Sequence, residues 1–111
     1  VEMAPPAVRC LKANIASLEV QDEARIASED VLRVLKTPPA EPYSLVFMDP
    51  PYRKNLANPA FRLLATRHWL APGAFVTAEI EKDAQLTLPP EWTLEAERLF
   101  GQTRICIWTL P

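Results

Sequence analysis

The chain has 111 residues, enough for one small domain with a core of its own. Hydrophobic residues make up 49% and charged residues 23%, the balance of an ordinary globular domain, and no apolar run reaches membrane-spanning length. The net charge of -2 argues against a broad basic surface that grips nucleic acid, so any such contact must be local.

Two cysteines, Cys10 and Cys106, are separated by almost the whole chain and fit no metal-ligand spacing, so no metal is expected. The first residues lack the basic segment and apolar stretch of a signal peptide. We therefore interpret both cysteines as single buried thiols in a reducing compartment. The expected location is the cytoplasm, without membrane contact.

The first third of the chain reads as helix, strand, helix. Apolar residues recur at helical spacing over residues 5–19, and Pro5 and Pro6 are tolerable only in the first turn. Residues 24–28 then predict a short strand, and residues 31–36 a brief helix. A proline-rich loop follows, since prolines in this segment prevent the helix from continuing.

The next elements surround a second cluster of prolines. Leu45–Met48 is a continuous apolar run, typical of a strand that is covered on both faces in a parallel sheet. A helix is predicted from Asn58 as its cap, with Pro59 at its first position. The pattern extends this helix as far as residues 71–73.

Three strands complete the chain. Residues 74–80 form the first, and residues 93–99 and 103–110 predict an antiparallel hairpin because their connection is short. The alternation of helices and strands indicates one α/β domain over residues 1–111. Its sheet is expected to be mostly parallel, with helices on both faces in three α/β/α layers. Ligands of such sheets bind beyond the carboxyl ends of the strands.

Asp49-Pro50-Pro51-Tyr52 follows the apolar run at such an end. The prolines lack amide hydrogens and fix their φ angles, so the turn is stiff. The Asp49 carboxylate and the Pro50 carbonyl could accept both hydrogens of an exocyclic amino group and turn the nitrogen lone pair toward an electrophilic methyl group. Tyr52 offers a flat face on which a base can stack. The alternative is that these residues form only a rigid turn.

The segments LVFMDPPY and WLAPGAFVTAEIE, together with the closing hairpin, resemble the bacterial RsmD-type methyltransferases. These enzymes use S-adenosylmethionine to modify a guanine N2 amine of 16S ribosomal RNA. The resemblance covers Val1 to Leu110 and implies a Rossmann-like class I methyltransferase fold. It also implies ribosomal RNA, or an assembling small ribosomal subunit, as the partner.

Carried over by position, the resemblance makes Glu2 the acceptor for the ribose hydroxyls of S-adenosylmethionine and places Met3 against its adenine. Asp30 would accept from the adenine amino group, with Val31 beside it. Residues 49–52 would hold the target base. Without the resemblance, Glu2 is an ordinary solvated residue near a chain end, and Asp30 is the cap of the helix that follows.

Other polar residues near these positions allow two readings. Arg53 and Lys54 can meet phosphates that flank the target base, or they can lie in a solvated loop. Glu79 and Glu81 fit a polar strand face that also opens toward the site. The only histidine, His68, near a helix end, is assigned a structural role. The three tryptophans are expected in or beside the core: Trp69, Trp92 and Trp108.

The sequence departs from the RsmD pattern in one respect. The acidic, glycine-rich cofactor loop after the first strand is absent, and the only glycines are Gly73 and Gly101. We therefore expect a C-terminal portion of the domain that lacks the first strand and this loop. Two other functions stay open. One is a DNA methyltransferase acting on adenine N6 or cytosine N4, because the motif is shared with such enzymes. The other is a non-catalytic fragment.

Overall fold

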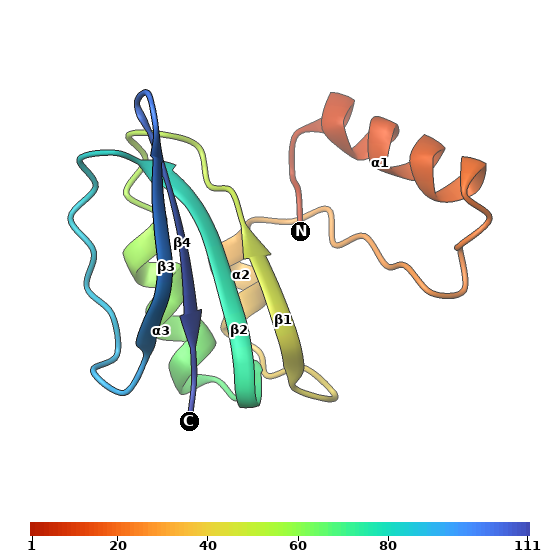
Figure 1. The fold of residues 1–111 in the computed structure, drawn as a ribbon. Coiled ribbons are helices and arrows are strands. Elements are labelled where there is room, and N and C mark those ends of the chain that lie inside the picture. Colours follow the sequence, from red (N-terminus) through yellow and green to blue (C-terminus); the bar gives the residue numbers. More distant parts are fainter. The chain divides into compact units, whose positions relative to one another are not determined.

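The computed structural model describes residues 1–111 as two compact units, Val1–Thr37 and Pro38–Pro111 (Figure 1). The first unit holds two helices. The second holds a four-stranded sheet and one helix. None of the helices combines the length and the apolar character needed to cross a bilayer.

The first unit begins with helix α1, Pro5–Ser17, whose two prolines occupy the first turn as predicted. Helix α2, Val31–Leu35, is only five residues long. The Asp30 side chain accepts a hydrogen bond from the backbone N–H of Arg33 at 3.1 Å, which satisfies a donor that the first turn leaves free.

Two expectations for this unit were wrong. Residues 24–28 form no strand, because no segment pairs along them, although the backbone N–H of Glu2 donates to the Ala27 carbonyl at 3.0 Å. A single bond of this kind is short of a ladder. Cys10 is exposed rather than buried, since it lies on an outer position of α1, whereas Cys106 is buried as expected.

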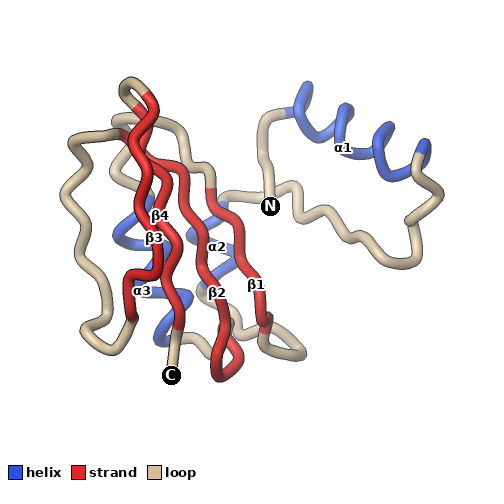
Figure 2. Tube along the Cα trace, in the orientation of Figure 1, coloured by secondary structure: helices blue, strands red, loops and turns tan.

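The second unit is built on a mixed sheet with the strand order β1-β2-β4-β3 (Figure 2). Strand β1 is Tyr43–Met48, β2 is Leu70–Glu81, β3 is Thr93–Phe100 and β4 is Thr103–Thr109. β1 and β2 are parallel, and the other two pairings are antiparallel. The α/β class and the closing hairpin are confirmed. The parallel share is smaller than expected because residues 24–28 do not join the sheet.

Helix α3, Ala57–Thr66, covers one face of this sheet and contributes Phe61 to a core built mainly from β2 and β4 (Figures 1 and 2). Phe61 is fully buried, and its ring meets Trp92 and Trp108 edge-on with centroids 5.8 and 5.3 Å away. Two tryptophans therefore belong to the core as predicted. Trp69 instead stacks on Tyr43 with a centroid separation of 5.9 Å.

The predicted ends of α3 were displaced. Asn58 is not the cap, because the helix begins at Ala57 and its N-cap position, Leu56, makes no side-chain capping bond. The helix ends at Thr66 and β2 already begins at Leu70, so residues 71–73 belong to the strand. The reversal between them is made by His68, which lies past the helix end with a φ of 59°.

The opposite face of the sheet was expected to be covered and is exposed within this unit. Phe47 is 75% exposed and Leu45 52%, while Val46 and Met48 alternate with them and pack against the core. Register places Leu45 beside Phe75 of β2, which is 48% exposed. Strand β1 therefore carries apolar side chains on both faces of the sheet, but within the second unit only one of these faces is packed against other residues. We call the other face the open face.

Candidate functional site

The Asp-Pro-Pro-Tyr turn leaves the carboxyl end of β1, at the place where the sequence predicts it. Asp49 is exposed and Pro50 is half-buried. Tyr52 is 40% exposed, so part of its surface is open to a ligand. The turn therefore brings a carboxylate, a proline carbonyl and an aromatic ring together at the end of one strand.

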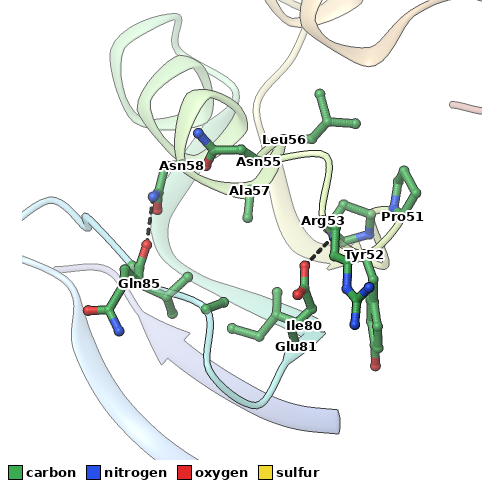
Figure 3. Close-up of a pocket in the computed structure, with 13 residues that line it drawn as sticks. Pro51, Tyr52, Arg53, Asn55, Leu56, Ala57, Asn58, Ile80, Glu81 and Gln85 are labelled. Carbon is green, nitrogen blue, oxygen red and sulfur yellow. Dashed lines mark hydrogen bonds between the residues drawn. The ribbon is translucent and has the colours of Figure 1, made fainter. Parts of the chain in front are cut away.

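The loop after the prolines is bonded to two neighbouring strands. The Tyr52 hydroxyl and the Thr103 hydroxyl share a hydrogen bond with 2.5 Å between oxygens. The backbone N–H of Arg53 donates to the carboxylate of Glu81 (Figure 3). The structure thus gives Glu81 a defined partner within the loop, in keeping with a strand end that opens toward the site. The Arg53 and Lys54 side chains are exposed in the loop.

A hollow lies beside this loop, on the side of α3 (Figure 3). Its walls come from the turn, from the start of α3, and from the end of β2 with the loop that follows. Asn58 ties two of these walls together: its side-chain N–H donates to the Gln85 carbonyl at 2.7 Å, and its carbonyl accepts from the Thr87 N–H at 2.8 Å. Side chains that line the hollow include Pro50, Pro51, Tyr52, Arg53, Ile80 and Glu81.

A second, shallower hollow lies on the open face of the sheet. It contains Asp49, together with Thr77 and Glu79 of β2. Phe47 of β1 and Ile105 of β4 supply its apolar part. Asp49 therefore lines one hollow, while Pro50 to Tyr52 line the other. The turn separates two surfaces, and a base that contacts both Asp49 and Tyr52 would lie across it.

The four residues that the resemblance assigned to the cofactor all lie in the first unit. Glu2 is half-buried, and its Oε1 accepts from the Ala4 N–H at 3.0 Å. Met3 is 63% exposed, and Val31 is half-buried at the start of α2. Asp30 is the cap of α2, as its sequence position alone suggested. The backbone bond between Glu2 and Ala27 joins the two segments that carry these residues.

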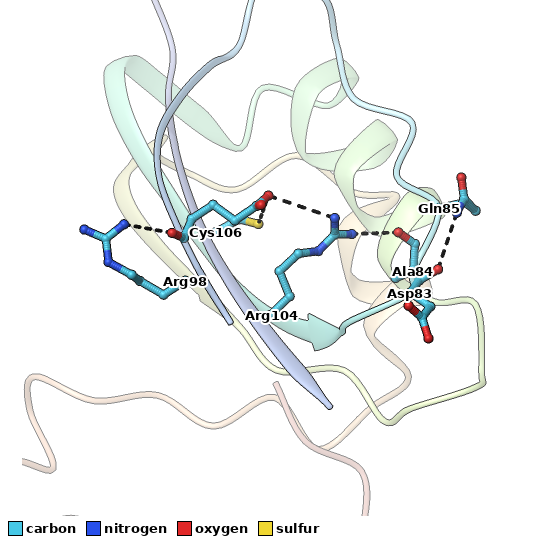
Figure 4. Close-up of polar contacts among 7 residues, drawn as sticks. Asp83, Ala84, Gln85, Arg98, Arg104 and Cys106 are labelled. Carbon is cyan, nitrogen blue, oxygen red and sulfur yellow. Dashed lines mark hydrogen bonds and ion pairs between the residues drawn. The ribbon is translucent and has the colours of Figure 1, made fainter. Parts of the chain in front are cut away.

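A polar network joins β3 and β4 to the loop that follows β2 (Figure 4). Arg104 donates to the Ala84 carbonyl at 2.6 Å and lies 4.0 Å from the Glu97 carboxylate. The Cys106 thiol donates to the same carboxylate at 3.7 Å. Burial, and next the nearby charge of Glu97, raise the pKa of this thiol against the opposing effect of Arg104. Cys106 is therefore a buried core residue whose thiol is held in its protonated form.

Sequence reasoning missed Thr103 altogether. It is 51 residues from Tyr52, and nothing local distinguishes it from the other threonines of the hairpin. The available signal was the register of the hairpin against β2, which pairs Glu81 with Thr103. That register depends on the tertiary structure of the whole sheet.

A mixed sheet with helices, and an acidic Pro-Pro-Tyr turn at the carboxyl end of a parallel strand, are the features of a methyltransferase domain. The comparisons with known proteins agree. The chain belongs to the family described as Conserved hypothetical protein 95, which matches residues 1–109. The resemblance to the RsmD group is confirmed, because curated relatives carry the name Ribosomal RNA small subunit methyltransferase D.

Among these relatives, the Haemophilus influenzae protein is 40% identical over 93 residues, which are 82% of this chain and 48% of that protein. The Escherichia coli K12 protein is 32% identical over 103 residues, 92% of this chain and 51% of that protein. The chain therefore spans about half the length of the curated relatives it matches.

Solved structures give the same result for the fold. A structure described as a methylase from H. influenzae has a TM-score of 0.89 at 34% identity, over 99% of this chain and 70% of that one. A structure described as a methyltransferase from E. coli has a TM-score of 0.88 at 29% identity, over 98% of this chain and 59% of that one.

Proposed function

We propose that the protein containing this chain is an S-adenosylmethionine-dependent methyltransferase of ribosomal RNA, and that its target is the N2 amino group of a guanine in 16S RNA. The observation that carries the proposal is the Asp49–Tyr52 turn at the carboxyl end of β1, with Tyr52 exposed and anchored. The names of the curated relatives support ribosomal RNA as the substrate.

In this proposal, the turn orients the amino group. The Asp49 carboxylate and the Pro50 carbonyl each accept one of its hydrogens, which draws the nitrogen lone pair out of conjugation with the ring and directs it toward the methyl group. The carboxylate also stabilises the positive charge that develops on the nitrogen. The new nitrogen–carbon bond would form as the bond between the methyl carbon and the sulfonium sulfur breaks, and the nitrogen would then lose one proton by way of the Asp49 carboxylate. Tyr52 stacks on the base and holds it in place. No covalent intermediate is required, because orientation supplies much of the rate.

The proposed cofactor supplies a methyl group on a sulfonium centre. The residues of the first unit fit its nucleoside part by their chemistry. Glu2 and Asp30 each use one carboxylate oxygen for a backbone N–H, which leaves acceptor capacity for ribose hydroxyls or an adenine amino group. Met3 presents an exposed apolar side chain that suits an adenine face, and Val31 lies at the start of the same helix as the Asp30 cap.

Substrate contacts near the turn are local, as the net charge requires. Arg53 and Lys54 are exposed directly after Tyr52, where each could meet a phosphate beside the target base. The partner would be 16S RNA, free or in an assembling small subunit. Work on ribosomal RNA in turn implies a cytoplasmic enzyme.

The test is Asp49→Ala in the full-length protein. Removing one orienting acceptor should lower kcat on the order of 10²-fold, with little change in the Kd for S-adenosylmethionine. Asp22→Ala, which removes a carboxylate from an exposed turn of the first unit, is the charge-matched control. Single-turnover methylation and calorimetry give the two quantities. Near-normal turnover in Asp49→Ala would remove Asp49 from the mechanism.

A further inference from the structure

Two consecutive residues of the loop are anchored to two residues that face each other across the sheet. Tyr52 bonds to Thr103, and the backbone N–H of Arg53 bonds to Glu81. Glu81 ends β2, Thr103 begins β4, and the two are direct partners in the antiparallel register. One cross-strand pair of the sheet therefore holds both the ring hydroxyl of Tyr52 and the backbone N–H that follows it.

The cross-strand pair itself is rigidly placed. Register between β2 and β4 runs without a bulge from Phe75 to Glu81. Just beyond it, the Lys82 N–H donates to the Gln102 carbonyl at 2.7 Å, which continues the pairing into the hairpin turn. Glu81 and Thr103 are both half-buried, whereas Tyr52 and Arg53 are exposed. The sheet therefore holds Glu81 and Thr103 in place, whereas Tyr52 and Arg53 have little packing of their own.

The loop needs such an anchor for a conformational reason. Pro50 and Pro51 stiffen the turn but donate no hydrogen bond, so Tyr52 and Arg53 are the first residues after Met48 and Asp49 that can tie it down with a backbone N–H. Arg53 and Asn55 have φ angles of 62° and 48°, in the left-handed region that Asn tolerates but that strains a residue such as Arg. This conformation persists only where surrounding contacts hold it.

We infer that Glu81 and Thr103 are positioning residues that fix the Tyr52 ring for the target base. This inference rests on the proposed function. Thr103 sets the direction of the ring through the Tyr52 hydroxyl, and Glu81 holds the backbone that carries it. The ring face stays free for stacking because it is the hydroxyl, at the ring edge, that is bonded. Neither residue need contact substrate.

The activity test is a double-mutant cycle in the full-length protein. Tyr52→Phe and Thr103→Val each remove the same hydrogen bond, worth about 3- to 10-fold in kcat/KM. The double variant should lose no more than either single one, because the two side chains act as one unit. Thr103→Ser restores a hydroxyl and should restore most activity. Additive losses, or a Ser variant as impaired as the Val variant, would overturn the inference.

A matched control lies at the other end of the same strand. The Thr109 hydroxyl bonds to the Glu95 carboxylate at 2.5 Å, about 20 Å along β4 from Thr103. Thr109→Val makes the same chemical change to a threonine of β4 and should leave kcat/KM close to that of wild type, because Thr109 bonds to Glu95 and not to Tyr52. A loss equal to that of Thr103→Val would show that damage to β4, rather than the bond to Tyr52, explains the effect.

Amide hydrogen exchange separates this inference from the proposed function, because it needs neither RNA nor cofactor. Glu81→Gln replaces a charged acceptor by a weaker neutral one and should speed exchange of the Arg53 amide about 5-fold. Unchanged exchange would overturn the anchor whatever the activity. Faster exchange, with no methylation of ribosomal RNA by the wild-type protein, would keep the anchor and overturn the proposed function instead.

Discussion

Tyr52 presents two chemically separate groups, a ring face that is open and a hydroxyl that is bonded to Thr103. Base stacking on an aromatic ring is worth about 1–3 kcal/mol, so Tyr52→Ala should lower use of the RNA substrate about 5- to 150-fold. Tyr52→Phe keeps the ring and loses only the anchor, so its loss should be much smaller. Steady-state kinetics on ribosomal RNA measure both. Equal losses would mean that the hydroxyl, not the ring, carries the function.

The two cysteines should differ sharply in reactivity. Burial raises the pKa of the Cys106 thiol, so at neutral pH a smaller fraction of it is ionised than of an ordinary exposed thiol. The thiolate is the reactive form of cysteine. Cys10 is exposed. In the native protein at pH 8, a thiol reagent should modify Cys10 quickly and Cys106 slowly, as peptide mapping of the labelled protein would show. In denaturant, Cys10 and Cys106 should both react. Fast labelling of Cys106 in the native protein would contradict its burial.

At the scale of elements, Asn58 joins the start of α3 to the loop between β2 and β3 through two hydrogen bonds. Asn58→Ala removes both and should lower the free energy of unfolding by about 1–3 kcal/mol. Asn58→Asp keeps the acceptor for the Thr87 N–H and should lose less. Urea unfolding of the full-length protein, followed by tryptophan fluorescence, measures the difference. Equal stability of all three proteins would show that this loop is held by other contacts.

The sequence predicts elements where one local signal dominates. Prolines mark the start of α1, Asp30 caps α2, and the turn at Gly101, with a φ of 60°, joins the hairpin. The α3 end was misplaced because apolar residues 69–71 fit a helix as well as a strand, and pairing with β1 decided for the strand. Residues 24–28 have the composition of a strand, but they form none because no neighbouring segment pairs with them.

The candidate site likewise has one part that the local sequence predicts and another that it does not. The Asp49–Tyr52 turn is contiguous in sequence, and its place after an apolar strand could be predicted from local pattern alone. Its anchors could not, because Glu81 and Thr103 join it across 28 and 51 residues, through a register that only the folded sheet defines. The roles of Glu2, Met3, Asp30 and Val31 stay predictions.

At the scale of the whole molecule, two features should make residues 1–111, produced alone, prone to associate. β1 is an edge strand, and the open face beside it carries exposed Leu45, Phe47 and Phe75. We also expect weak or no binding of S-adenosylmethionine, since no glycine-rich turn faces its methionine end. Light scattering and calorimetry test this against a polypeptide of the relatives' full length. A monomeric 1–111 chain with tight cofactor binding would refute it.

Methyl transfer by the full-length protein to a base amino group in ribosomal RNA is proposed here and can be tested directly. The direct measurement uses S-adenosylmethionine with a labelled methyl group and 16S RNA or small subunits from cells that lack this enzyme, followed by nuclease digestion and mass spectrometry of the nucleosides. The account predicts label in N2-methylguanosine, and its loss in Asp49→Ala. Label on a ring carbon or ribose of the RNA, no label in the RNA, or label only in a parallel reaction with DNA, at adenine N6 or cytosine N4, would contradict it.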